Sequence, residues 1–167
     1  MRRNDREIKS HEEILEILRR CDVIRLGIIT PDYPYVVPMN FGFESSGKAL
    51  TLWLHCANEG LKINLIKPNC RVGFEADCSH RLIAGEAACD YTMEYESVIG
   101  CGDIHICNDM QSKRYGLKSI MRHYEPEKEF EIPEQMLASV CVLRVDVMQI
   151  TGKRLATIKS AVCENKE

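Results

Sequence analysis

The segment from His55 to Lys62 combines residue types that could hold a phosphate group and act on a neighbouring ring. It has the pattern of a strand that runs into a helix, and a helix N-terminus offers unpaired backbone N–H groups and a partial positive charge to an anion. Asn58, Glu59 and Gly60 occupy that start, and glycine lets the backbone approach a ligand closely. Lys62 would add a full positive charge, and the imidazole of His55 could move a proton near neutral pH.

The same residues also fit an ordinary strand-to-helix connection. A Gly-x-Lys pattern with a solvated lysine is common, and local pattern alone does not separate it from a phosphate site. His55 taken by itself fits a half-buried histidine hydrogen-bonded to the backbone as well as it fits a reactive group. Both interpretations of the segment therefore stay open at this level.

A second set of chemically capable residues shares one predicted strand. Cys101, Asp103, His105 and Cys107 alternate along it and are types that bind zinc. Alternate side chains on an extended strand stand nearly 7 Å apart, roughly twice the 3.3 Å rise per residue, and diverge, so tetrahedral ligation is awkward. We predict ordinary strand packing here and no metal site.

Apolar periodicity and turn residues predict the elements that carry these side chains. Leu50, Leu52 and Leu54 share one face of a strand that ends at His55, with Trp53 and His55 on the other face. The predicted strands are 23–30, 35–43, 49–55, 70–76, 96–107 and 139–150, the first two forming a β-hairpin. The predicted helices are 11–20 with Ser10 as N-cap, a short one between 58 and 67 with Asn58 as N-cap, and 109–124. The segment 77–94 has no clear pattern.

This element order favours an α+β domain built around an antiparallel split β-barrel with flanking helices. There is no βαβ alternation and no internal repeat, and no linker divides the chain. We expect one domain over residues 1–155 and a flexible tail over 156–167. The exposed edges and apolar faces of such a barrel would be covered by a second copy of the chain, so a homodimer is expected.

Composition restricts the partners. The chain has 22 Lys plus Arg against 25 Asp plus Glu, a net charge of −3, so neither nucleic acid nor an anionic membrane surface is an expected partner. No apolar run approaches about 18 residues, and the charged first residues carry no export signal, which predicts a cytoplasmic protein. The nine cysteines are irregularly spaced without a C-x-x-C pair, so we interpret them as reduced thiols.

Several blocks of the sequence, spread over most of its length, resemble the nitroimidazole-resistance family of pyridoxamine 5'-phosphate oxidase-like flavoproteins. The matching blocks are Arg25–Gly27, Pro34–Gly42, Leu54–Ala57, Gly60–Ile63, Ser97–Gly100 and Met121–Tyr124. The resemblance implies an FMN-binding split barrel that works as a homodimer with the cofactor between the two subunits.

Carried over position by position, the resemblance also implies roles for single residues. The cofactor-binding residues would be Val37, Pro38, Met39, Asn40, His55, Cys56, Ala57, Lys62, Ser97 and Val98. Lys62 would meet the flavin phosphate, and His55 would face the reactive side of the ring as the candidate catalytic residue. His123 is a second, weaker candidate near the cofactor, although a cationic residue at a helix C-terminus needs no functional explanation.

The function implied is an FMN-dependent reductase that delivers electrons from reduced flavin to a small acceptor, such as the nitro group of a 5-nitroimidazole. One alternative is a flavin- or haem-binding protein of the same fold that stores or senses its ligand without turnover. A pyridoxamine-phosphate-type oxidase ranks lower, because no basic cluster beyond Lys62 is free to bind a second phosphate.

Overall fold

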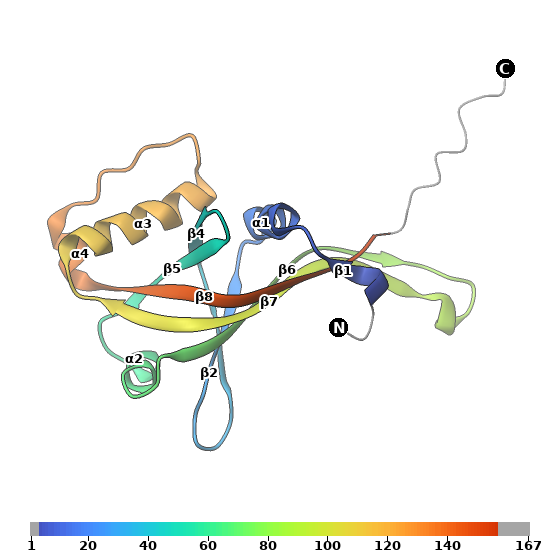
Figure 1. Ribbon diagram of the computed structural model, residues 1–167, viewed down its shortest axis with the longest axis horizontal. Helices are drawn as coiled ribbons and strands as arrows, with labels where there is room; N and C mark the ends of the chain where they lie inside the picture. The colour runs from blue at the N-terminus through green and yellow to red at the C-terminus, as the bar shows by residue number, and fades with distance from the viewer. Residues whose placement is uncertain (1–3, 157–167) are drawn as a thin grey trace.

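A single antiparallel sheet dominates the computed structural model, which describes residues 4–156 (Figure 1). Seven strands follow the order β3-β2-β6-β7-β8-β5-β4, and the short β1 pairs with β8. The strands are β1 (Glu7–Ile8), β2 (Ile24–Ile28), β3 (Tyr35–Met39), β4 (Phe41–Ser46), β5 (Ala49–Ala57), β6 (Arg71–Ile83), β7 (Thr92–Cys107) and β8 (Val140–Leu155). The helices are α1 (His11–Arg20), α2 (Leu61–Ile66), α3 (Met110–Tyr124) and α4 (Glu134–Ser139), with short 3-10 turns at Asn4–Arg6 and Ala88–Asp90. No helix of this part of the chain is long and apolar enough to cross a bilayer.

The two ends of the sheet meet at Asn40. β3 pairs with β2 and β4 pairs with β5, so the strands at opposite ends of the order are separated by one residue. The sheet must therefore curl until its ends come together, although hydrogen bonds within residues 4–156 do not close it into a barrel. The prediction of one continuous strand over 35–43 is wrong at this point, because the chain changes partner strand there.

A tyrosine hydroxyl holds this change of partner in place. The Tyr124 hydroxyl accepts hydrogen bonds from the Asn40 side chain (3.2 Å) and the Phe41 backbone N–H (3.1 Å). The same hydroxyl donates to the Asp22 carbonyl at 2.7 Å. Tyr124, the last residue of α3, thus provides a hydrogen-bond acceptor for the Phe41 N–H at the point where the chain changes its partner strand.

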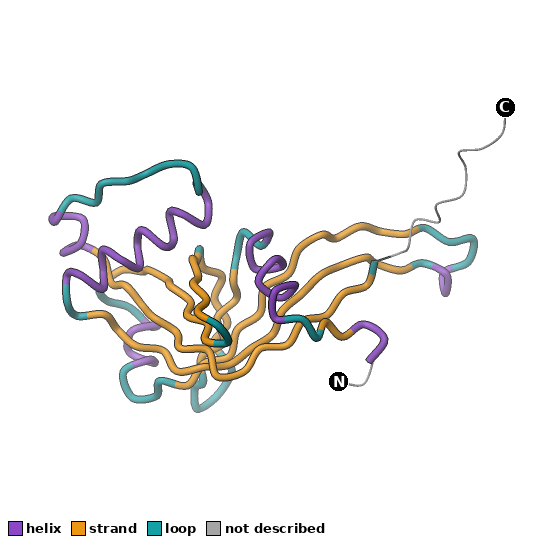
Figure 2. The backbone as a smooth tube through the Cα atoms, turned by 45° about the horizontal axis from the view of Figure 1, so that its top comes forward, coloured by secondary structure: helices purple, strands orange, loops and turns teal. Residues whose placement is uncertain are grey.

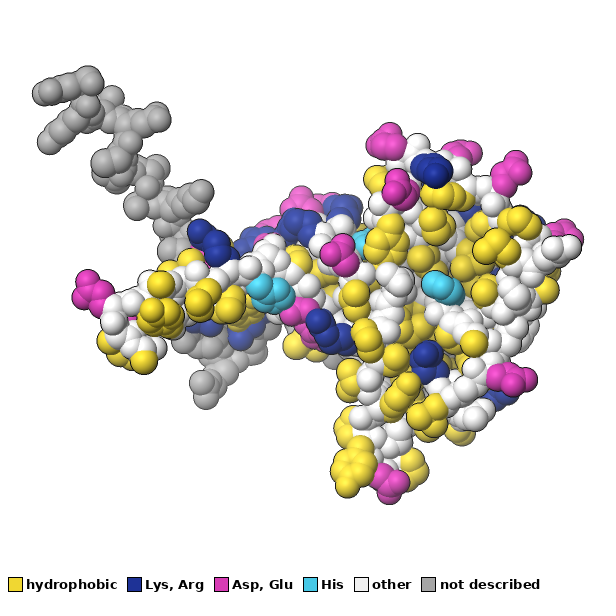
Figure 3. Space-filling view, turned by 180° about the vertical axis from the view of Figure 1, so that it is seen from behind, with side chains coloured by type: hydrophobic (Ala, Val, Ile, Leu, Met, Phe, Trp, Pro, Cys, Tyr) yellow, Lys and Arg dark blue, Asp and Glu magenta, His cyan; other side chains and the backbone are white. Residues whose placement is uncertain are grey.

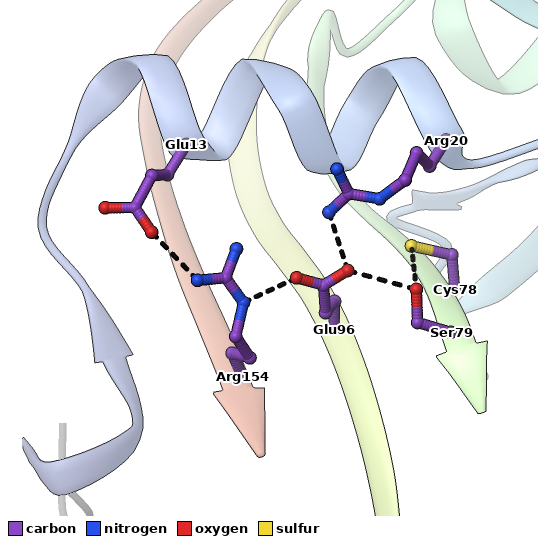
Figure 4. Close-up of polar contacts among 6 residues, drawn as sticks. All are labelled: Glu13, Arg20, Cys78, Ser79, Glu96 and Arg154. Atoms are coloured by element: carbon purple, nitrogen blue, oxygen red, sulfur yellow. Dashed lines mark hydrogen bonds and ion pairs between the residues drawn. The ribbon is translucent and has the colours of Figure 1, made fainter. Parts of the chain in front are cut away.

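Helix α1 confirms the predicted range 11–20. The Ser10 hydroxyl accepts from the Glu13 N–H, as an N-cap does. The helix buries Ile14, Leu15, Ile17 and Leu18 in the main core, which also takes the inward residues of the curled sheet. The Glu13 carboxylate binds Arg154 on β8 instead of completing a capping box, and so ties the helix to the sheet (Figure 4).

The segment without a clear pattern, 77–94, is the outer part of a long hairpin. β6 and β7 continue past the predicted strand ends and project from the body as an arm (Figure 2). A bulge between Cys78 and Arg81, with Ser79 at φ 60°, interrupts their pairing. Ion pairs such as Arg81–Glu94 link the two strands beyond the bulge. Strand β8 likewise runs to Leu155, and the predicted tail lies outside the described residues from 157 onward.

Helix α3 packs closely on β4 and β5, and two glycines, Gly42 and Gly116, make this close packing possible. A Cβ on Gly42 would lie 2.4 Å from the carbonyl of Ser119, and one on Gly116 would lie 2.5 Å from the Trp53 ring. Helix α4, which was not predicted, begins after Pro133 and buries Leu137. These two helices and the loop 125–133 form a separate layer over the end of the sheet (Figure 1).

Candidate functional site

His55 and Asn40 come together where the sheet changes partner. The β4–β5 ladder ends at the pair Phe41–Leu54. Asn40 directly precedes Phe41, and His55 directly follows Leu54. Both are exposed. β5 continues to Ala57, two residues beyond the predicted end at His55. The structure therefore places one end of the Val37–Asn40 block beside the His55–Ala57 block, as a shared site requires.

The His55 side chain lines an apolar cavity of about 340 Å³ under α3 and α4. The cavity is lined by His55, Leu117, Ile120, Met121, Phe130, Glu131, Ile132, Met136 and Val140. His55 and Glu131 are the titratable groups of this lining. A small flat molecule could bury its apolar part here and present a polar group to the imidazole, the usual composition of a small-molecule pocket.

Trp53 fixes the helix that forms the roof of this cavity. It lies on the same face of β5 as His55, as predicted, and its ring packs at 5.5 Å and 70° against Tyr115 of α3. Leu50, Leu52 and Leu54 on the opposite face belong to the main core, also as predicted. Helix α3 is thus held on the His55 side of β5.

The helix at the proposed phosphate site begins two residues later than predicted, with Gly60 and not Asn58 as its N-cap. Helix α2 starts at Leu61 with Gly60 as its N-cap, whereas the Asn58 side chain donates to the Ala138 carbonyl at 3.1 Å. The prediction of Asn58 as N-cap is therefore wrong, because that amide links the turn to α4 instead. Gly60 has φ 128°, a backbone conformation that residues with a side chain rarely adopt. Apart from its chain neighbours, no residue comes within 4 Å of the position that a Cβ would occupy.

Lys62 lies close enough to the end of β5 to affect the pKa of the Cys56 thiol. Burial raises the pKa of Cys56 to about 11, with a further contribution from Cys141, and the positive charge of Lys62 opposes this rise. Among the described residues no carboxylate forms an ion pair with Lys62. A cation, an open glycine turn and the first unpaired N–H groups of α2 thus occur together after Ala57, a donor set that suits a phosphate.

The predicted residues on β3 face in two directions. Met39 is buried, and Val37 is partly buried against the main core. Pro38 and Asn40 are exposed. Only these two can present side chains to a ligand, whereas Val37 and Met39 can offer it backbone groups.

Ser97 and Val98 are not brought to this site within one chain. They pair with Asp77 and Ala76 on β6, whereas the row of His55 crosses β7 at Cys107. Nine or ten residues of strand, roughly 30 Å, separate the two positions. The Val98 side chain is also fully buried. The two residues therefore lie away from the His55 strand end in the described chain.

The other candidate residues have structural partners. Cys101, Asp103, His105 and Cys107 do share one face of β7, and His105 lies 3.4 Å from an Asp146 carboxylate oxygen. Across residues 4–156, no three His, Cys, Asp or Glu side chains gather as metal ligands do.

His123 joins α3 to the end of α1. Its Nε2 lies 2.8 Å from the Cys21 carbonyl, and its ring packs 4.5 Å from that of Phe41. Burial lowers the pKa of His123, although the hydrogen bond to Cys21 opposes the shift. These contacts explain the residue without a ligand.

Hydrophobic side chains are spread over much of the back of the molecule (Figure 3). The large exposed ones include Val36, Ile99 and Met148 on the sheet and Leu82, Tyr91 and Met93 on the arm. On the sheet, Pro38 and Ile99 lie in one cross-strand row with Arg25 and Glu75, on the face that also carries Ser97. The sequence interpretation expected uncovered apolar faces but did not locate this one, because alternation identifies two faces of a strand but not which of them stays uncovered.

Comparison with known proteins identifies the fold. Residues 10–154 match the pyridoxamine 5'-phosphate oxidase family. The chain belongs to this family. A crystal structure of a candidate 5-nitroimidazole antibiotic resistance protein from Bacteroides thetaiotaomicron is 36% identical, with a TM-score of 0.77 over 89% of this chain and 86% of that one.

Two solved structures of lower sequence identity share the fold alone. The flavocytochrome Anf3 from Azotobacter vinelandii is 15% identical, with a TM-score of 0.77 over 94% of this chain and 72% of that one. A FAD and haem binding protein from Mycobacterium smegmatis is 13% identical, with a TM-score of 0.77 over 91% and 74%. No curated protein sequence matches the chain.

Proposed function

We propose that this protein is an FMN-dependent reductase that delivers electrons from reduced flavin to a small acceptor, such as the nitro group of a 5-nitroimidazole. The observation that carries the proposal is the position of His55. This residue lines an apolar cavity of about 340 Å³ and stands beside Asn40, with the Gly60 turn and Lys62 following on the same strand end. The similarity to the Bacteroides resistance protein supports the acceptor class.

The residues present fit a flavin phosphate. Lys62 supplies the charge, and the open space at Gly60 lets an oxygen atom reach the first N–H groups of α2. Exposed Pro38 and Asn40 offer a surface for the ring. When bound, the flavin supplies two-electron transfer, which no amino-acid side chain provides. Distant relatives whose names refer to flavin support a flavin, and the single cationic side chain at the turn leads us to propose FMN.

In this proposal His55 positions and protonates the acceptor. Its imidazole would donate a hydrogen bond to a nitro oxygen and supply a proton as negative charge develops there. The cavity would exclude water from the acceptor ring, which strengthens that hydrogen bond. Asn40, fixed by Tyr124, would orient the same group from the other side of the strand end.

We also propose that the working form is a homodimer in the cytoplasm. A second copy would cover exposed apolar side chains such as Val36 and Ile99, and would bring its Ser97 to the site of the first. The partner would also complete a split barrel, whose two sheet ends already meet at Asn40. Light scattering of the purified protein tests this directly, and a monomer at micromolar concentration would contradict it.

A flavin titration tests the cofactor site. We expect the purified chain to bind FMN, and Lys62→Ala to weaken FMN at least tenfold while leaving riboflavin, which has no phosphate, unaffected. Lys67→Ala is the matched control, because this lysine lies at the other end of α2. Equal loss in both variants, or no flavin uptake by the native protein, would refute the site.

Turnover tests the role of His55. We expect His55→Ala to keep bound flavin but lose about 10²–10⁴-fold in acceptor reduction, the usual contribution of a proton donor. His105→Ala, which changes a half-exposed histidine elsewhere on the same face, should leave turnover unchanged. Undiminished reduction by His55→Ala would remove the residue from the mechanism.

One alternative is favoured by a specific observation. The cavity beside His55 contains Met121 and Met136 among apolar side chains, a composition that also suits a haem whose iron is bound by a histidine. Absorption spectra after addition of FMN or of haemin distinguish the two, and saturable haem binding without flavin binding would favour a storage or sensing protein. Oxidation of pyridoxamine phosphate would instead require a second phosphate site.

A further inference from the structure

Two cysteines face each other across the neighbouring strands β5 and β8. Cys56 and Cys141 are direct partners in the antiparallel ladder, one step along from the pair His55–Val142. Directly opposed residues in such a ladder have Cα atoms about 4.5–5.5 Å apart and side chains on the same face. A disulfide needs Cα atoms about 4.4–6.8 Å apart, so the backbone already meets this requirement.

The two thiols interact and are free. Each thiol affects the pKa of the other, and neither is part of a disulfide. Burial raises the pKa of both thiols, and lysines oppose this on each side, Lys62 at Cys56 and Lys113 with Lys67 at Cys141. Both side chains belong to or pack against the main core, so neither can turn away from the other without opening it.

Small molecules can reach the pair. Cys56 is half-buried, and Cys141, although only 4% exposed, lines a cavity of about 250 Å³ with Asn58, Lys67 and Lys113. A cavity of this size admits a molecule as small as a hydroperoxide. The thiolate is the form that attacks such an oxidant, and the lysines offset part of the rise in pKa that burial causes at both thiols.

We propose that Cys56 and Cys141 form a site of reversible oxidation, at which hydrogen peroxide converts the two thiols into a disulfide that joins β5 to β8. The peroxide O–O bond breaks as the Cys56 sulfur is oxidised to a sulfenic acid, and one water leaves. The Cys141 thiol then forms the S–S bond and displaces a second water. Two thiols are oxidised and one peroxide is reduced to two waters.

The position of this pair gives the oxidation a consequence. Cys56 lies between His55 and Ala57, and Lys62 acts on the same thiol. A disulfide would fix β5 to β8 at the strand end where the proposed ligand site begins. The oxidation itself needs neither a flavin nor an acceptor, so it stands apart from the proposed function.

A second pair of cysteines, Cys21 and Cys78, could form a competing disulfide. Cys21, which follows α1, interacts with Cys78 of β6. These residues lie on elements that are not paired with each other, so no strand register holds their backbones at disulfide distance. We therefore expect peroxide to link Cys56 to Cys141 first.

The test maps disulfides in the full-length native protein. After treatment with hydrogen peroxide and alkylation, we expect seven of the nine thiols to remain, with a mass loss of about 2 Da, a linked peptide pair containing residues 56 and 141, and reversal by dithiothreitol. The midpoint of thermal unfolding should rise by about 5–12 °C on oxidation. Complete alkylation of both cysteines, or a linked pair 21 and 78 in their place, would overturn the proposal.

Serine variants provide the matched comparison. Cys56→Ser and Cys141→Ser should each abolish the mass loss and the thermal shift, whereas Cys89→Ser, an exposed residue of the turn Ala88–Asp90 on the arm, should retain both. Loss of the shift in Cys89→Ser would contradict the assignment. The peptide map of the native chain decides the question even if a serine variant does not fold.

Discussion

Glu96 sits at the centre of a charge network that seats α1 on the base of the arm. Its carboxylate accepts hydrogen bonds from Arg20 at 2.6 Å, from Arg154 and from the Ser79 hydroxyl at 3.0 Å, and its side chain is 13% exposed (Figure 4). Replacement by glutamine keeps the shape and removes the charge. Arg20 and Arg154 would then face each other across a mostly buried neutral group.

The expected loss follows from this burial. Removal of one partner from a buried charge pair costs about 3–5 kcal/mol. The side chains of Arg20 and Arg154 are 43% and 31% exposed, so solvent screens part of this charge, and glutamine retains one acceptor oxygen. We therefore expect Glu96→Gln to cost about 1–3 kcal/mol, which for a chain of this size corresponds to a fall of about 2–12 °C in the thermal unfolding midpoint. Glu12→Gln is the control. The Glu12 side chain is 66% exposed and lies 3.2 Å from Arg19, and such surface pairs contribute less than about 1 kcal/mol.

The pH dependence gives an independent measurement. Burial alone would raise the pKa of Glu96, but hydrogen bonds from Arg154, Arg20 and Ser79 outweigh it and lower the pKa below the ordinary value of 4.5. A carboxyl with a depressed folded pKa contributes stability that is present above its unfolded pKa and is lost as pH falls through the folded value. The difference between native protein and Glu96→Gln should therefore be constant near neutral pH and shrink below pH 4.5. Equal denaturant midpoints for Glu96→Gln and Glu12→Gln at neutral pH would refute the reasoning.

Two further changes test the packing around the site. Gly42→Ala should cost about 1–3 kcal/mol, because the new methyl group would collide with the Ser119 carbonyl at 2.4 Å, whereas Gly27→Ala has its nearest atom at 3.6 Å and should cost less; denaturant titration compares them. His123→Gln should flatten the pH dependence of stability: burial holds the folded pKa of His123 below 6.5, so the native protein loses stability as pH falls below 6.5 toward the folded value, and glutamine can still donate to the Cys21 carbonyl. An unchanged slope in this window would show that another group titrates there.

Local pattern predicted the elements whose partners lie nearby in sequence. Helix α1 follows from Ser10 and its apolar spacing, and β5 follows from the alternation of leucines with Trp53 and His55. The break at Asn40 did not follow, because both halves of that strand are extended and only their different partner strands separate them. The arm was missed for a related reason: its strands mix polar and apolar residues without a regular alternation and are held by cross-strand pairs such as Arg81–Glu94.

The candidate site was predicted in part. His55, Asn40 and Lys62 do lie around one strand end, although the Asn58 cap was wrong. The distance of Ser97 from that end follows from the register of β7, and no sequence pattern reveals register. The cavity beside His55 was also not predicted, because α4 and the loop 125–133, whose residues have no periodicity, complete its lining beside α3.

The alternation of β5 links the two activities proposed for this strand end. Trp53 and His55 point toward α3 and the apolar cavity, while Leu54 and Cys56 point into the core and toward Cys141. A slip of one residue in the β5–β8 register would exchange these faces, placing the imidazole in the core and the thiol in the cavity. Gly116 favours the observed register, since a Cβ there would lie 2.5 Å from the Trp53 ring and 2.7 Å from the Val142 side chain. The chemistry at His55 and the oxidation at Cys56 therefore depend on the same helix contact, and a side chain at position 116 should disturb both.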